Sequence, residues 1–119
     1  MSYELLDNSG GMLTFRISGK LTYAEYEEGQ RKAAEILREQ GKVRILTLLE
    51  DFLGTEKEGE WGDISFAMEY DKHIEKMAIV GEKKWQDMTL LFTGKGIRRL
   101  PIEYFEPGDL AKAKAWLMA

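Results

Sequence analysis

Two successive changes of hydrophobic period constrain the fold of this chain more than any single motif. Within residues 13–17, apolar side chains alternate with polar ones, the pattern of a strand with one buried face. Within residues 22–41, apolar side chains instead return every three or four positions, which indicates an amphipathic helix. Residues 43–49 are nearly all apolar, as expected for a central strand covered on both faces. This succession predicts a parallel strand–helix–strand unit.

The ends of the first helix carry specific signals. Thr22 is followed three residues later by Glu25, the spacing of a capping box at a helix start. Gly41 provides a stop, because glycine adopts the backbone conformation that ends many helices. We therefore predict a helix between Thr22 and Gly41.

The rest of the chain continues the alternation. Residues 3–6 predict an edge strand, joined to the next strand by a hairpin turn over residues 7–11. Strands and helices then alternate. We predict a second helix from Asp63, a strand at residues 77–80, a third helix around Trp85, a strand at residues 100–105 and a closing helix after Pro107. The predicted order is ββαβαβαβα, a single α/β domain over residues 1–119. It has a mainly parallel five-stranded sheet, an antiparallel N-terminal hairpin and four helices.

The composition narrows the classes of function. The 119 residues suffice for one domain with one core, and the net charge of −4 argues against a general affinity for nucleic acid. There is no cysteine, so disulfides, thiolate metal sites and cysteine nucleophiles are excluded. The chain begins without the pattern of a signal peptide, and no apolar run is long enough to span a membrane. We expect a soluble, cytoplasmic protein.

The second half of the chain carries a family resemblance. Four features carry it: the motif KMAIVG at residues 76–81, Trp85, the sequence EYF at residues 103–105, and a terminal helix with Ala113 and AWL at residues 115–117. Together they are similar to the pattern of the SpoIIAA-like group of STAS/SEC14 domains. That superfamily includes anti-sigma factor antagonists and CRAL-TRIO lipid carriers. The resemblance implies a STAS/SEC14-like fold. None of its landmark residues is chemically reactive, so it implies no enzymatic activity.

The chain departs from the antagonists at their phosphorylation site. Antagonists carry a phosphorylatable serine in a turn after a buried strand, whereas residues 50–54 read EDFLG. Ser65 lies later, near the predicted start of the second helix, where a helix N-terminus could stabilise a phosphate. Nearby acidic residues, including Asp63, would oppose it. Ser65 is a candidate phosphosite, and the alternative is a solvent-facing residue of the first turn.

The stretch KMAIVGEKKWQDM, residues 76–88, resembles the start of a phosphate-binding strand–loop–helix unit. A phosphate cradle needs several converging backbone amides, usually supplied by repeated glycines, and here Gly81 is alone and precedes Glu82. We interpret Gly81 as the turn out of a buried strand. A separate candidate is a small basic patch able to hold an anion, formed by Lys83, Lys84, Lys95, Arg98 and Arg99. The alternative is ordinary helix termination at residues 93–96, where a lysine suits the helix dipole.

No other constellation predicts chemistry. Glu50 and Asp51 follow a buried strand but match no metal-binding spacing, and the single histidine, His73, has no predicted nucleophile. We expect no catalytic, metal or cofactor site and a protein that is not an enzyme.

The acidic segment at residues 50–70 holds more large apolar residues than one short helix can bury. These are Phe52, Leu53, Trp61, Phe66, Met68 and Tyr70. A neighbouring helix could cover them, a partner subunit could, or the segment could form a lid over an apolar ligand. The leading hypothesis is a non-enzymatic binding or regulatory module that acts through protein–protein contact, as a homodimer. The alternative is a carrier or sensor of a small apolar, lipid-like ligand beneath this segment.

Overall fold

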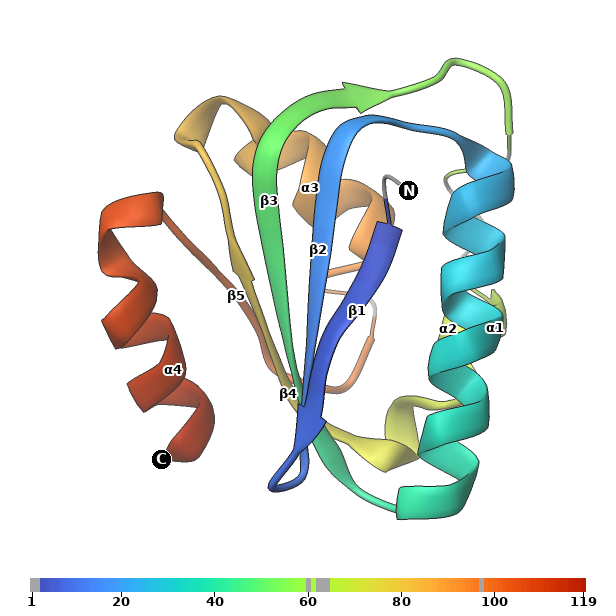
Figure 1. Cartoon of the computed structure of the whole chain (residues 1–119), viewed down its shortest axis with the longest axis vertical. Coiled ribbons are helices and arrows are strands. Elements are labelled where there is room, and N and C mark those ends of the chain that lie inside the picture. Colours follow the sequence, from blue (N-terminus) through green and yellow to red (C-terminus); the bar gives the residue numbers. More distant parts are fainter. Residues whose placement is uncertain (1–2, 60, 62–64, 97) are drawn as a thin grey trace.

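The structure is a computed structural model that describes residues 3–59, 61, 65–96 and 98–119. Five strands form one sheet, in the spatial order β1-β2-β3-β4-β5 (Figure 1). Their bounds are β1 Tyr3–Ser9, β2 Met12–Leu21, β3 Val43–Thr55, β4 Ile74–Val80 and β5 Ile102–Phe105. β1 pairs with β2 antiparallel, and the other three pairings are parallel. The mainly parallel sheet with an antiparallel N-terminal hairpin, predicted from the sequence, is therefore confirmed.

Three helices of eight or more residues accompany the sheet in the part of the chain that the structure describes. They are α1 Tyr23–Gln40, α3 Gln86–Thr93 and α4 Leu110–Met118. The helix expected from Asp63 is reduced to α2 Ser65–Met68, a single turn, and Asp63 itself lies outside the described residues. Three short 3-10 turns, η1 Asp71–His73, η2 Lys83–Trp85 and η3 Pro107–Asp109, complete the chain. The predicted count of four helices is thus not confirmed.

The start and stop signals of α1 act as the sequence indicates. The Thr22 hydroxyl accepts a hydrogen bond from the backbone N–H of Glu25 at 3.2 Å and donates one to the Glu25 carboxylate at 2.9 Å. At the other end, Gly41 has a φ of 78°. This left-handed backbone is easy for glycine and costly for other residues. Both ends of the 18-residue helix are therefore fixed by local chemistry.

The two faces of the sheet bury different cores. One face carries Phe15, Ile45 and Ile79 and is covered by α1 and α3. The opposite face carries Leu46 and Ala78 and is covered by α4 (Figure 1). The inward residues of β2, β3, β4 and β5 divide between these two cores, as the pleat requires. None of the described helices is both long and apolar enough to cross a lipid bilayer.

Candidate functional site

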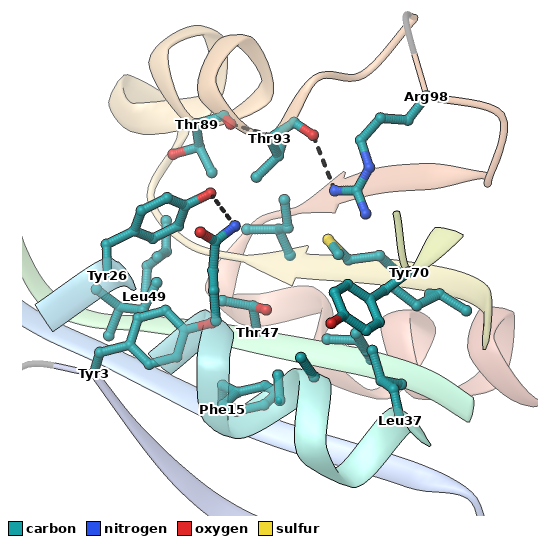
Figure 2. Close-up of a pocket in the computed structure, with 18 residues that line it drawn as sticks. Tyr3, Phe15, Tyr26, Leu37, Thr47, Leu49, Tyr70, Thr89, Thr93 and Arg98 are labelled. Atoms are coloured by element: carbon teal, nitrogen blue, oxygen red, sulfur yellow. Dashed lines mark hydrogen bonds between the residues drawn. The ribbon is translucent and has the colours of Figure 1, made fainter. Parts of the chain in front are cut away.

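A cavity of about 100 Å³ lies between α1, α3 and the sheet face that they cover (Figure 2). Its floor comes from β2, β3 and β4, including Phe15, Ile45 and Ile79. Ala33 and Leu37 on α1 form one wall. These side chains are apolar, so most of the cavity surface is suited to hydrocarbon.

One polar residue interrupts the floor. Thr47 lies in the middle of β3 between Ile45 and Leu49, and all three line the cavity. Thr47 is half-buried although it belongs to the central strand of the sheet, because its side chain borders the cavity. The central strand is thus not packed tightly against the helices at this point.

The polar end of the cavity is built around Arg98, whose side chain is only 4% exposed. Its Nε and Nη2 donate hydrogen bonds to Oδ1 of Asp71, at 2.9 Å and 2.6 Å, and its Nη1 donates to the backbone carbonyl of Thr93, at 3.1 Å. A buried charge is stable only when it is paired in this way. The ion pair therefore fixes the guanidinium at the edge of the cavity, where Figure 2 shows it pointing inward.

Tyrosines add further polar groups to the cavity wall. The hydroxyl of Tyr26 accepts a hydrogen bond from Nε2 of Gln30 at 3.1 Å, and both residues line the cavity (Figure 2). Burial raises the pKa of Tyr26 to about 12, while the nearby positive charge of Arg98 acts in the opposite direction. Burial also raises the pKa of Tyr3, which lines the cavity from β1. Both phenols are therefore neutral hydrogen-bonding groups near neutral pH.

Thr89 contributes a buried hydroxyl with no hydrogen-bond partner in the described part of the chain. The residue is 2% exposed and lines the cavity from α3. Its backbone carbonyl accepts a hydrogen bond from the hydroxyl of Thr93 at 2.8 Å, but its own hydroxyl is unused. Buried polar groups are normally paired, so this hydroxyl needs an explanation.

The structure describes the side chains of five of the six apolar residues of the 50–70 segment, and it does not bring these five together on one surface. Phe52 is buried against Trp85, with ring centroids 5.1 Å apart, and Trp61 packs on Tyr23 and Tyr26, at 5.1 Å and 5.3 Å. Leu53 is 70% exposed and Met68 is 42% exposed, whereas Tyr70 lines the cavity. The side chain of Phe66 lies outside what the structure describes.

The five basic residues of the candidate anion patch also lie in different environments. Arg98 is buried in its ion pair with Asp71, whereas Lys83, Lys84 and Arg99 are exposed. Lys95 forms an ion pair with Glu103 and also donates a hydrogen bond to the backbone carbonyl of Ile102. The Arg98 side chain is thus buried, whereas Lys83 and Lys84 are exposed to solvent.

Ser65 and Gly81 are the two residues that the sequence associates with phosphate. Ser65 is exposed at the first position of α2, and its role as a phosphosite stays a prediction. The amide of Gly81 donates to the carbonyl of Phe105 at 3.0 Å, so it is used within the fold rather than offered to a phosphate. A Cβ at Gly81 would lie 2.6 Å from the Tyr104 hydroxyl, which explains the glycine by close packing.

Sequence reasoning missed most of the cavity. Tyr26 and Gln30 follow the helical period of residues 22–41, and Tyr70 is in the candidate apolar set, but no motif marks Thr47 or Thr89. The available signal was a polar residue inside an apolar pattern: Thr47 interrupts residues 43–49, and Thr89 falls on the inward side of α3. Such positions mark either a satisfied hydroxyl or a cavity, and sequence alone does not distinguish the two.

Comparison with known proteins identifies the family. The family model described as SpoIIAA-like matches residues 12–118. The chain belongs to the SpoIIAA-like family. Among solved structures, this SpoIIAA-like domain is similar to a crystal structure of an uncharacterised protein from the DUF3478 family with a SpoIIAA-like fold, from Shewanella loihica PV-4. The TM-score is 0.71 at 19% identity, over 97% of this chain and 91% of the other. No curated protein matches the chain.

Proposed function

We propose that this SpoIIAA-like domain is a non-enzymatic binding module that holds a small, largely apolar molecule in the cavity between α1, α3 and the sheet. The observation that carries the proposal is the cavity itself, with apolar walls and one polar end at Arg98. Ligand sites commonly combine a mostly apolar lining with a few polar groups that orient the ligand. The site lies beside the 50–70 segment, from which Tyr70 reaches it.

The volume sets the size of the ligand. Pockets for drug-sized molecules are usually about 300–1,000 Å³, and a buried apolar cavity of about 150 Å³ in another protein binds benzene. At about 100 Å³, this cavity suits a molecule no larger than benzene, roughly four to six non-hydrogen atoms. A whole membrane lipid is too large for it without a shift of α1.

The lining favours binding over catalysis. Among the described residues that line the cavity, none is Asp, Glu, His or Cys. Those residue types supply most general bases and nucleophiles, and burial raises the pKa of the lining Tyr3 and Tyr26, which makes these phenols poor bases near neutral pH. Arg98 is held by Asp71 and cannot act as a base, because a guanidinium keeps its proton at all physiological pH values.

The test uses two compact probes, cyclopentane and cyclopentanone, added to isotopically labelled protein and followed by NMR. A ligand of five or six atoms gains at most about 1.5 kcal/mol per atom, so millimolar probe concentrations are appropriate. We expect saturable shifts of backbone amide signals in α1 and β3 for at least one probe. Ala33→Leu fills the cavity and should remove these shifts, whereas the matched control Ala111→Leu, on the exposed side of α4, should keep them. Absence of shifts for both probes would contradict the proposal.

Protein contact through the 50–70 segment, as a homodimer, is the second candidate. The observation that favours it is Leu53, which is 70% exposed at the end of β3 beside the buried Phe52. Leu53→Asp should shift the protein towards monomer in sedimentation velocity. Leu91→Asp is the matched control, since Leu91 is 80% exposed on α3. A wild-type protein that is monomeric at all concentrations, or equal effects of the two variants, would count against this candidate.

A further inference from the structure

The unused hydrogen-bond donors of Arg98 restrict the chemistry of the ligand. A guanidinium carries five N–H donors. Asp71 accepts two of them and the carbonyl of Thr93 accepts a third. One N–H on Nη1 and one on Nη2 therefore have no acceptor within the described part of the chain. Because the Arg98 side chain is only 4% exposed, water can satisfy these donors only from the cavity side.

A second group at the same cavity is also unsatisfied. The hydroxyl of Thr89 is buried and has no partner among the described residues. Thr89 and Thr93 lie one turn apart on α3, and Thr93 supplies the carbonyl that holds Nη1 of Arg98 (Figure 2). Arg98 and Thr89 thus border the same cavity, where a ligand with a hydrogen-bond acceptor would satisfy the arginine donors that a hydrocarbon would leave unpaired.

The charge balance decides which acceptor fits. Asp71 accepts from two nitrogens of Arg98, so the pair is electrically neutral overall. A carboxylate ligand would leave a net negative charge in a largely buried site, at a high desolvation cost. An uncharged carbonyl oxygen has two lone pairs, so it can accept from both free N–H groups without adding charge.

Resting on the function proposed above, we infer that the ligand is a small uncharged carbonyl compound, a ketone or an amide, with a compact apolar body. Its oxygen accepts from Nη1 and Nη2 of Arg98, and its hydrocarbon part lies over Thr47 and the apolar floor. The site therefore selects against fatty acids and other anions, although its central polar residue is an arginine.

Two matched pairs of probes test this inference on the full chain by NMR titration. Cyclopentanone and cyclopentane differ by the carbonyl oxygen, and we expect the ketone to bind at least about tenfold more tightly, as a hydrogen bond to a charged donor allows. 3-Methyl-2-butanone and isobutyrate, with six non-hydrogen atoms each, have nearly the same shape but differ in charge, and we expect the ketone again to bind more tightly. Equal binding of cyclopentane and cyclopentanone would overturn the carbonyl inference and leave the proposed cavity function intact. Tighter binding of isobutyrate would overturn the charge argument.

A variant assigns the effect to Arg98. Arg98→Lys keeps a positive charge beside Asp71 but loses the second donor nitrogen of the fork. We expect the advantage of cyclopentanone over cyclopentane, with both affinities measured on the variant, to fall towards onefold. If this variant does not fold, the side-chain nitrogen signals of Arg98 in the wild-type protein provide the readout. These signals should shift with cyclopentanone and stay in place with cyclopentane, and an equal response to both would contradict the assignment.

Discussion

The two faces of the sheet differ in how completely they are packed. Under α4, Ala113 and Leu117 have no exposed surface and contact Leu46 and Ala78, which are also fully buried. Under α1 and α3, the core is larger, but it encloses a cavity with a buried arginine and an unpaired threonine hydroxyl. The same strands supply both faces, so the difference does not come from the strands' own propensities.

The difference indicates a division of roles between the faces. Tight apolar packing of α4 stabilises the fold, and Lys76 anchors the helix end by donating to the carbonyls of Trp116 at 2.8 Å and Ala119 at 3.1 Å. A cavity costs stability, so a fold that keeps one under α1 and α3 gains something other than stability there. Function is expected on the α1–α3 face.

One substitution made on both faces gives the largest expected contrast. Ala113→Leu adds three carbons to a fully packed site and should lower the free energy of unfolding by about 1–3 kcal/mol. Ala33→Leu adds the same atoms beside the cavity and should change it by less than about 1 kcal/mol, because the new side chain has space to enter. Urea unfolding measures both values. Equal losses on the two faces would contradict the contrast.

Alkaline pH should destabilise the protein through the tyrosines of the cavity face. The pKa of Tyr26 is raised by burial from 10 to about 12, so the unfolded chain loses its proton near pH 10 while the folded protein keeps it. In this window the unfolded state binds fewer protons, and the free energy of unfolding falls as pH rises. One tyrosine contributes up to about 1.4 kcal/mol per pH unit between pH 10 and 12. The contribution is fully retained below pH 10.

Tyr26→Phe provides the check on this prediction. Urea unfolding at several pH values should show a shallower fall above pH 10 in the variant than in the wild type. A residual slope is expected, because burial also raises the pKa of Tyr3 and of the partly exposed Tyr104, the latter to about 12. Identical slopes in variant and wild type would show that Tyr26 ionises as easily in the folded protein as in the unfolded chain.

The fold was largely predictable because local signals agreed with the global pattern. Thr22, Glu25 and Gly41 mark the ends of α1, and each acts through contacts within a few residues of itself. Some boundaries were less accurate. β1 continues to Ser9 because the turn is made by Gly10 and Gly11 alone, with φ values of 62° and 76°.

The candidate site was less predictable because it depends on contacts between distant parts of the chain. Arg98 was grouped with neighbouring lysines as a surface anion patch, but its partner Asp71 lies 27 positions away. No pattern within residues 93–99 predicts the pairing of Arg98 with Asp71. Likewise, Phe52 and Trp61 looked like surplus apolar residues, whereas Trp85 and the tyrosines of α1 cover them. Sequence periodicity shows which face is apolar, not which side chains across the core leave a gap.

The smallest expected effect concerns Thr89 and has an unusual sign. Thr89→Val replaces an unpaired buried hydroxyl by a methyl group of similar size and should raise the free energy of unfolding by about 1 kcal/mol. The matched variant Thr93→Val should lower it, because the Thr93 hydroxyl donates to the Thr89 carbonyl at 2.8 Å. Thermal unfolding of both variants measures the difference.

The same pair of variants separates a structural hydroxyl from a functional one. If Thr89→Val gains stability but binds cyclopentanone less tightly, the fold sacrifices stability at this position for recognition of the ligand. A loss of stability in Thr89→Val would instead mean that water in the cavity already satisfies the hydroxyl. The contrast between Thr89 and the α4 face would then be reduced to packing alone.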